Sequence, residues 1–389
     1  MNPTIAATAA AILLISSISR ADNWSNWRGP AQNGTAEATD LPTKFSKTEG
    51  IKWSVDMPGA SSATPAIWGD DVFVSSTDEE KEELIALCLD RKTGEEKWRK
   101  PLGKGLFQDN RSNYSGPSPT TDGEAVIFFY GTGDMAALSL EGGVLWQKNI
   151  QEDYDPFYFL WTFSTSPLLH NGSVILQVLQ RDTPVHKFQK GGKDHDSFLI
   201  AFDAKTGKEQ WKVKRNSEAV AEAKEAFSTP VIHTLRDGKE IMLVSGGDIF
   251  TAHDPASGKE LWRWGTYNED RIGHWRLVPS PVAGAGVALI CAPKKAPVYA
   301  VEAETGNLIW VSEDPAVSSD VPTPAFLDGK FYILSDVQKS LSCVDARTGE
   351  IHWTSELETR SKFEASPTIA DGKIYMINHA GEVFVALGW

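Results

Sequence analysis

Short apolar segments separated by turn residues recur along almost the whole chain. Residues 125–129, 174–176 and 331–334 each follow an Asp-Gly or Asn-Gly pair, and a second apolar segment comes after each of them. Asn-Gly and Asp-Gly favour tight hairpins because both residues tolerate positive φ. Short apolar segments between such turns predict antiparallel strands.

Two landmarks divide these strands into seven units. One is a Ser-Pro or Thr-Pro pair that opens a strand, a place that suits proline because it has no N–H to donate within a sheet. The other is a tryptophan shortly after a tight turn, in most units a turn with glycine. The pairs begin at Thr64, Ser118, Ser166, Thr229, Ser280, Thr323 and Ser366; the tryptophans are Trp53, Trp98, Trp146, Trp211, Trp262, Trp310 and Trp353; the glycines of the five most similar turns are Gly94, Gly207, Gly258, Gly306 and Gly349.

Four antiparallel strands in each unit predict an all-β fold, a β-propeller with seven blades, or eight if the chain is truncated. We expect each tryptophan on the outermost strand, where its ring covers the seam to the next blade, so these tryptophans and glycines are assigned a structural role. The last unit stops after a third strand near residues 383–387, whereas residues 51–55 resemble an outer strand without partners. The sequence therefore predicts that this N-terminal strand completes the last blade and closes the ring.

The N-terminus and the charge narrow the class of protein. Residues 5–18 are apolar and precede Ser19-Arg20-Ala21, which predicts a signal peptide over 1–21 with cleavage after Ala21. An N-terminal extension over 22–50 and one propeller over 51–389 follow. No later stretch is apolar enough to span a membrane, and the net charge of −14 disfavours nucleic acid and anionic lipid as partners. We expect a periplasmic or secreted monomer.

Three cysteines remain in the exported chain. Cys88, Cys291 and Cys343 all lie in apolar, strand-like segments. We expect small buried core residues, with one disulfide as the alternative.

The pattern Asp-x-x-Thr-Gly-x-x-x-Trp, together with the Ser/Thr-Pro strand, resembles the repeat of pyrrolo-quinoline quinone (PQQ) enzymes. Quinoprotein alcohol dehydrogenases and the non-catalytic outer-membrane assembly factor BamB share that repeat, and the resemblance covers about residues 50–389. Residues 24–30 and Asn33-Gly34 resemble the opening of exported PQQ-repeat proteins of planctomycete-type bacteria. The resemblance implies the fold and leaves open whether the chain is an enzyme or a binding scaffold.

Motifs for chemistry are sparse in the sequence. Quinoprotein alcohol dehydrogenases hold the quinone against a vicinal disulfide and bind Ca²⁺ through oxygen ligands, but this chain has no Cys-Cys pair and no evident set of acids on its inner strands. We therefore expect no cofactor and no metal, with PQQ and Ca²⁺ as the alternative. His186, Asp194, His195 and Asp196 lie in an insertion, residues 180–197, which we interpret as a solvated mobile loop rather than a metal site.

The candidate binding residues lie in three connections that lead into Ser/Thr-Pro strands. In a propeller such connections emerge on one face around the channel mouth, and aromatic side chains beside Arg and His are typical of binding surfaces. Packing of these loops over the channel is the alternative role. The candidates are Arg111, Asn113, Tyr114, Tyr158, Trp161, Arg271, His274, Trp275 and Arg276.

The function predicted from these observations is a non-catalytic exported propeller that binds a protein or carbohydrate partner on this face. The arginines and His274 would form a positive spot suited to carboxylates, sulfated sugars or an acidic peptide. A PQQ-dependent alcohol or sugar dehydrogenase and a BamB-like outer-membrane assembly scaffold are the alternatives.

Overall fold

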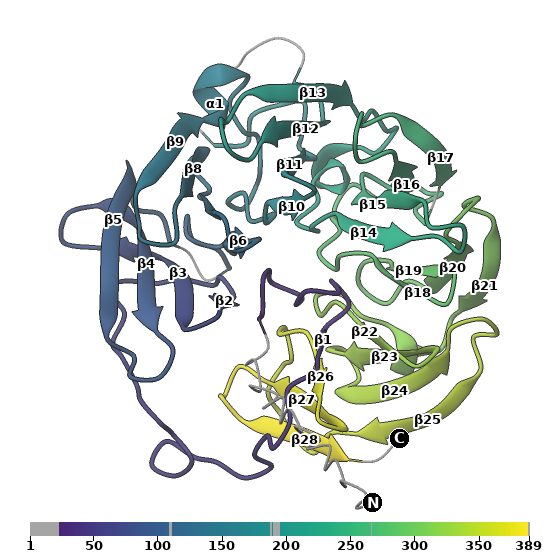
Figure 1. Ribbon diagram of the computed structural model, residues 1–389. Coiled ribbons are helices and arrows are strands. Elements are labelled where there is room, and N and C mark those ends of the chain that lie inside the picture. The colour runs from purple at the N-terminus through teal and green to yellow at the C-terminus, as the bar shows by residue number, and fades with distance from the viewer. Residues whose placement is uncertain (1–22, 109–110, 187–188, 190–194, 266, 388–389) are drawn as a thin grey trace, which may run out of the picture.

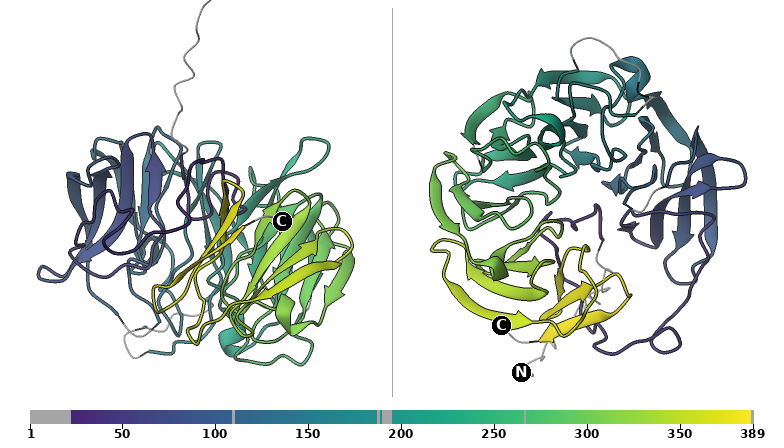
Figure 2. Two further views of the ribbon diagram at one scale, coloured as in Figure 1. Left: turned by 90° about the horizontal axis from the view of Figure 1, so that it is seen from below. Right: turned by 180° about the vertical axis from the view of Figure 1, so that it is seen from behind.

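Seven four-stranded sheets stand around a central channel in the computed structural model, which describes residues 23–108, 111–186, 189, 195–265 and 267–387. Figure 1 looks along the channel, and Figure 2 shows the ring from below and from behind. The predicted all-β propeller with seven blades is confirmed. In the described part of the chain, no helix has the length and apolar character needed to cross a membrane.

The first three blades are ordered from the channel outwards. Blade one contains β2 (Ala66–Trp68), β3 (Asp71–Asp78), β4 (Glu83–Asp90) and β5 (Glu96–Lys104); blade two contains β6 (Thr120–Thr121), β7 (Val126–Phe129), β8 (Asp134–Leu138) and β9 (Val144–Asn149); blade three contains β10 (Leu168–His170), β11 (Ser173–Val178), β12 (Phe198–Asp203) and β13 (Glu209–Lys214). The short helix α1 (Ile150–Asp153) follows β9.

The next three blades have the same order. Blade four contains β14 (Val231–Thr234), β15 (Glu240–Gly246), β16 (Ile249–His253) and β17 (Glu260–Gly265); blade five contains β18 (Val282–Gly284), β19 (Val287–Cys291), β20 (Val298–Glu302) and β21 (Leu308–Ser312); blade six contains β22 (Ala325–Leu327), β23 (Lys330–Ser335), β24 (Ser340–Asp345) and β25 (Ile351–Glu356). The 3₁₀ turns η1 (Ala221–Lys224) and η2 (Pro315–Val317) lie in the connections before blades four and six.

Burial follows the position of a strand within its blade. The second and third strands are buried almost throughout, because both of their faces pack against neighbouring blades. The outermost strands alternate between exposed and half-buried residues, as in β13. This is the alternation expected where one face of a strand meets water.

A contact between tryptophan and glycine repeats from blade to blade. Five outer-strand indoles lie over the turn glycine of the next blade, those of Trp98, Trp146, Trp211, Trp262 and Trp310, and the Trp53 indole lies over Gly94 in the same way. A Cβ on Gly207, for example, would stand 2.7 Å from the ring of Trp146. The indole N–H of Trp146 also donates to the Ala204 carbonyl in the same turn, at 2.8 Å. Equivalent indole bonds are made by Trp53, Trp98, Trp262 and Trp310. The predicted outer-strand position is confirmed for six tryptophans, from Trp98 to Trp353, and is wrong for Trp53, which lies outside any strand.

The last blade differs from the other six. It contains β26 (Thr368–Ala370), β27 (Lys373–Ile377) and β28 (Val383–Leu387), and an N-terminal strand, β1 (Thr35–Ala36), pairs parallel with β26 on its inner edge. An N-terminal strand thus joins the last sheet, as predicted, but it is not residues 51–55. Those residues form no strand, because Trp53 instead docks on blade one through its bond to the Arg91 carbonyl. Within the described residues, β28 pairs with β27 alone.

The three cysteines are buried and free. Cys88 and Cys343 are nearly inaccessible to solvent on the third strands of blades one and six. Burial raises the pKa of the Cys88 thiol to about 12, so this side chain is an inert packing residue. The expectation of small core residues is confirmed.

Candidate functional site

A collar of hydroxyl groups surrounds the central channel where the inner strands begin. Its members are the Ser and Thr residues of the seven Ser/Thr-Pro pairs. Six backbone N–H groups donate to the hydroxyl of the following blade at 2.8–3.1 Å, in the order Thr64, Ser118, Ser166, Thr229, Ser280, Thr323, Ser366. No seventh bond from Ser366 to Thr64 is found among the described residues. The collar therefore links neighbouring blades everywhere except at the seam between the last blade and the first.

The N-terminal segment, residues 24–36, crosses this channel as the purple chain inside the ring (Figure 1). It bonds to the inner strands of blades one, two, four, six and seven, through Ile67, Thr121, Ile232, Phe326 and Ile369. With the collar, its side chains line a channel cavity of about 410 Å³. Trp24, Trp27 and Arg28 of the predicted extension, residues 22–50, are thus part of the wall of the channel.

Arg28 anchors this segment. Its side chain is 2% exposed and donates to the carbonyls of Pro324 at 2.8 Å and Pro367 at 3.0 Å. The guanidinium also lies over the Trp27 ring, 5.6 Å from its centroid. Burial lowers the pKa of Arg28 to about 9, so the group still carries its charge at neutral pH.

A second cavity opens from the channel toward the loops. This arginine cavity, of about 130 Å³, is lined by Arg111, Trp161 and Arg276 together with Glu364. It shares Glu364 and several apolar side chains with the channel cavity, so the two are adjacent. The connections before blades two, three and five therefore do meet at one mouth of the channel.

Ion pairs hold the two arginines in place. Arg111 lies 3.6 Å from Glu364, which also accepts from His379 at 2.9 Å. Arg276 lies 3.4 Å from Glu222. The predicted positive spot is therefore moderated by acids that come from distant segments of the chain.

A buried carboxylate joins three of the connections. Glu225, which follows η1, is inaccessible to solvent; it pairs with Arg181 and accepts from the backbone N–H of Leu160 at 3.1 Å. Arg181 also approaches Glu222, the partner of Arg276, at 3.9 Å. Burial outweighs the pairing with Arg181 and raises the pKa of Glu225 to about 7. This network fixes the loop that carries Trp161 relative to the loop that carries Arg276.

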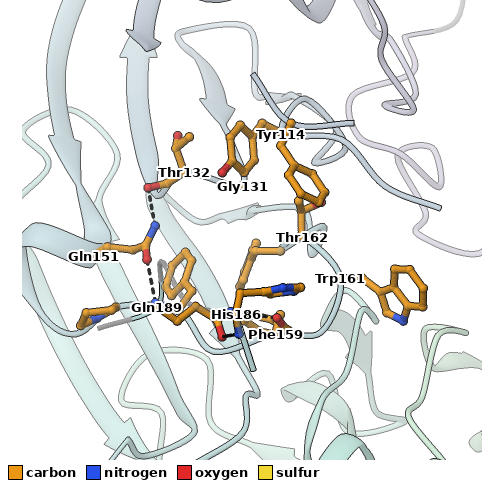
Figure 3. A pocket seen from close by; sticks show the side chains of 13 residues that line it. Tyr114, Gly131, Thr132, Gln151, Phe159, Trp161, Thr162, His186 and Gln189 are labelled. Carbon is orange, nitrogen blue, oxygen red and sulfur yellow. Dashed lines mark hydrogen bonds between the residues drawn. The ribbon is translucent and has the colours of Figure 1, made fainter. Parts of the chain in front are cut away.

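The third cavity is an aromatic pocket of about 300 Å³ between blades two and three (Figure 3). Trp161 and Thr162 line both this pocket and the arginine cavity. The remaining aromatic side chains of the lining are Phe107, Tyr114, Phe157, Phe159 and Phe163. The last three are buried: Phe157 stacks on Phe163 with 4.8 Å between ring centroids, and Phe159 meets both rings edge to face.

The nine predicted binding residues divide into three groups. Arg111, Trp161 and Arg276 line the arginine cavity, and Tyr114 lines the aromatic pocket. Asn113 and Tyr158 have internal roles: Asn113 accepts from Ser115 and donates to Ser62, and Tyr158 is fully buried against His195. The others lie apart from both cavities: Arg271 pairs with Glu218 and Asp248, Trp275 packs on a core cluster, and His274 is exposed.

In the described part of the long insertion, residues 182–185 are exposed as predicted, whereas both histidines contact the rest of the chain. His186 bonds to the Leu160 carbonyl at 2.7 Å, and His195 is only 5% exposed because it packs against Tyr158. Asp194 lies outside the described residues. No group of three or more potential metal ligands is found in the part of the chain that the structure describes.

The channel lining can be compared with what a quinone and Ca²⁺ require. Calcium takes six to eight oxygen ligands, with carboxylates among them. The channel cavity offers mostly hydroxyl groups and one carboxylate, Glu364, which Arg111 and His379 already engage. This donor set does not match a Ca²⁺-held quinone, and the dehydrogenase alternative stays a prediction from the resemblance.

Several residues of the site were not anticipated from the sequence. Glu222, Glu225 and Glu364 carry no motif, and each acts through partners far away in the chain. Arg28 lies within the family-like opening of residues 24–30, but its contacts with Pro324 and Pro367 were not anticipated. The collar hydroxyls did carry a signal, because every pair has Ser or Thr before proline. Only the ring geometry shows that their oxygens join the blades.

The repeated indole contacts and the Ser/Thr-Pro collar define a PQQ-like β-propeller. Solved structures with this fold include BamB from Moraxella catarrhalis (14% identity, TM-score 0.54, 82% of this chain and 80% of that one) and a europium-containing methanol dehydrogenase (12% identity, TM-score 0.66, 94% and 85%). A quinohemoprotein alcohol dehydrogenase from Comamonas testosteroni is also similar (12% identity, TM-score 0.59, 96% and 74%). At these identities the likeness concerns the fold alone.

Sequence comparison narrows the class further. A profile of the family described as outer membrane protein assembly factor BamB matches residues 35–175, 159–292 and 294–387. The chain belongs to this family. BamB of Burkholderia pseudomallei (strain K96243) is 26% identical over 189 residues, which make up 46% of this chain and only 39% of that protein.

Proposed function

We propose that this chain is a non-catalytic scaffold of the cell envelope that binds an acidic protein segment at the mouth of its channel. The description of the family and the name of the Burkholderia relative both refer to an assembly factor of the outer membrane. A protein partner is the kind of ligand that such a role requires. The signal peptide predicted over 1–21, which lies outside the described residues, is consistent with export.

The charge of the arginine cavity carries this proposal. Its lining contains two guanidinium groups, of Arg111 and Arg276, and one carboxylate, of Glu364. Glu222, which pairs with Arg276, also forms an ion pair with Arg181. The lining itself therefore has one more guanidinium than carboxylate, in a chain whose net charge is −14. With Arg181, Glu222 and Glu225 included, the network around the mouth has three arginines and three glutamates. Guanidinium groups bind carboxylates well because their N–H donors match the two oxygens.

The loops around the mouth are suited to binding a partner because hydrogen bonds hold them in place. Thr162 donates to the Asn113 carbonyl at 3.1 Å, and the Thr162 N–H donates to Ser112 at 3.2 Å. The loops before blades two and three are thus bonded to each other as well as to their blades. A preorganised surface loses little entropy when a partner binds.

Charge reversal at the mouth tests this function. The immobilised wild-type protein is used to capture its partner from an envelope extract, and the amount captured is quantified by mass spectrometry. The double variant Arg111→Glu, Arg276→Glu should capture at least tenfold less of that partner. The matched control is Arg99→Glu, Arg263→Glu. These arginines lie on outer strands, pair with Glu96 and Glu260, and their reversal changes the net charge equally.

Equal capture by the two double variants would contradict the proposed site. Dye-linked oxidation of an alcohol or sugar by the wild-type protein with added PQQ and Ca²⁺ would contradict the non-catalytic role. A melting temperature within a few degrees of wild type for both variants ensures that the comparison concerns binding.

A further inference from the structure

The aromatic pocket lies directly beside the arginine cavity. Its lining is mainly aromatic, whereas the arginine cavity contains charged side chains. Trp161 and Thr162 form the boundary between the two. Phe157, Phe159 and Phe163 are at most 6% exposed and belong to the core between blades two and three, so this wall is rigid. Trp161 at the boundary is half-buried and can meet a ligand.

The polar side chains of the pocket bond within the chain. Gln151 donates to the Thr132 carbonyl at 2.6 Å and accepts from the Phe157 N–H at 2.7 Å, as the dashed lines in Figure 3 show. Gln189 donates to the Phe159 carbonyl at 2.9 Å and accepts from the His186 N–H at 2.9 Å. A sugar would need several such groups for its hydroxyls, whereas an apolar side chain needs none.

Tyr114, at the rim of the pocket, can offer a hydrogen-bond donor to a ligand. Tyr114 is half-buried and packs against Phe107 with 5.6 Å between ring centroids and a tilt of 34° between the rings. Burial raises the pKa of the Tyr114 phenol, so it keeps its proton at neutral pH. An aromatic ring that enters the pocket would therefore meet ring faces and edges, with a neutral O–H at the rim.

We propose that the aromatic pocket takes an aromatic side chain of the partner segment while an adjacent acidic residue of that segment binds at the arginine cavity. This inference rests on the proposed function and names the partner's chemistry: an extended segment with an aromatic residue next to Asp or Glu. Side chains close together in sequence can reach both cavities because Trp161 and Thr162 belong to both linings. Buried aromatic anchors supply much of the binding energy in protein interfaces.

Blocked peptides test the pairing of the two cavities. The probes are acetyl-Gly-Phe-Asp-Gly-amide and its counterparts with Ala for Phe or Asn for Asp, titrated by ligand-observed NMR. Loss of the ring should weaken binding at least tenfold, and loss of the charge should weaken it severalfold. The protein variant Phe107→Ala should weaken the Phe peptide alone. The control Phe45→Ala, which removes an exposed ring outside the pocket, should change nothing.

Each result decides the matter. Equal affinity for the Phe and Ala peptides overturns the aromatic anchor, as does saturable binding of methyl glucoside in the same pocket. If no peptide binds although partner capture depends on Arg111 and Arg276, the inference falls and the proposed function stands. If capture is also insensitive to the arginines, both fall. The peptide comparison uses the wild-type protein, so it remains decisive even where Phe107→Ala fails to fold.

Discussion

At the scale of single residues, the tryptophan and the glycine of the repeat act on each other across the blade boundary. The sequence predicted both as structural, the glycine because the turn reverses the chain. Gly207 does have φ of +67°, but it also leaves room for the Trp146 indole. That second reason is invisible in the sequence because the two residues belong to different repeats.

A pair of glycine substitutions separates these two roles. Gly207→Ala adds a methyl group 2.7 Å from the Trp146 ring, whereas Gly172→Ala, at φ +73°, meets nothing within 4 Å. We expect Gly172→Ala to lower the free energy of unfolding by about 1–2 kcal/mol through backbone strain alone. Gly207→Ala should cost roughly 1–3 kcal/mol more through overpacking. Denaturant unfolding measures both, and equal losses would contradict the contact.

At the scale of elements, the strands were predictable and the N-terminal segment was not. A Ser/Thr-Pro pair marks the first strand of every blade, and Asn-Gly or Asp-Gly dipeptides mark the hairpins of five blades, because those signals are local. The closing strand was assigned to residues 51–55 from its resemblance to an outer strand, whereas β1 has only two residues and pairs in parallel. Its placement depends on Arg28, on backbone bonds to four blades and on the Gln32 side chain, which accepts from the Ile232 N–H of a fifth blade. These contacts leave no pattern in the sequence.

Removal of the Arg28 side chain tests the importance of that segment. Arg28→Ala should lower the free energy of unfolding by roughly 2–4 kcal/mol, because the buried carbonyls of Pro324 and Pro367 lose their donor. Arg99→Ala, which removes an exposed arginine, should stay within about 0.5 kcal/mol of wild type. A small effect of Arg28→Ala would mean that the backbone bonds of residues 24–36 suffice to hold the segment.

At the scale of the whole molecule, the ring gathers three connections that are far apart in the chain. Their convergence was predicted from propeller topology, and Arg111, Trp161 and Arg276 do line one cavity. Which aromatic side chains face a cavity and which pack inside could not be predicted, because both kinds occur in the same run from Tyr154 to Phe163. Tyr158 is buried in the core, whereas Trp161 lies at the mouth of the channel.

The central claim is that a partner binds at this mouth, and hydrogen–deuterium exchange of the protein with and without its captured partner tests it most directly. The account predicts slower amide exchange in peptides around Arg111, Trp161 and Arg276, and unchanged exchange in the outer strands β5, β13 and β17. Protection confined to outer strands, or to the exposed edge at β28, would place the partner elsewhere and contradict the account.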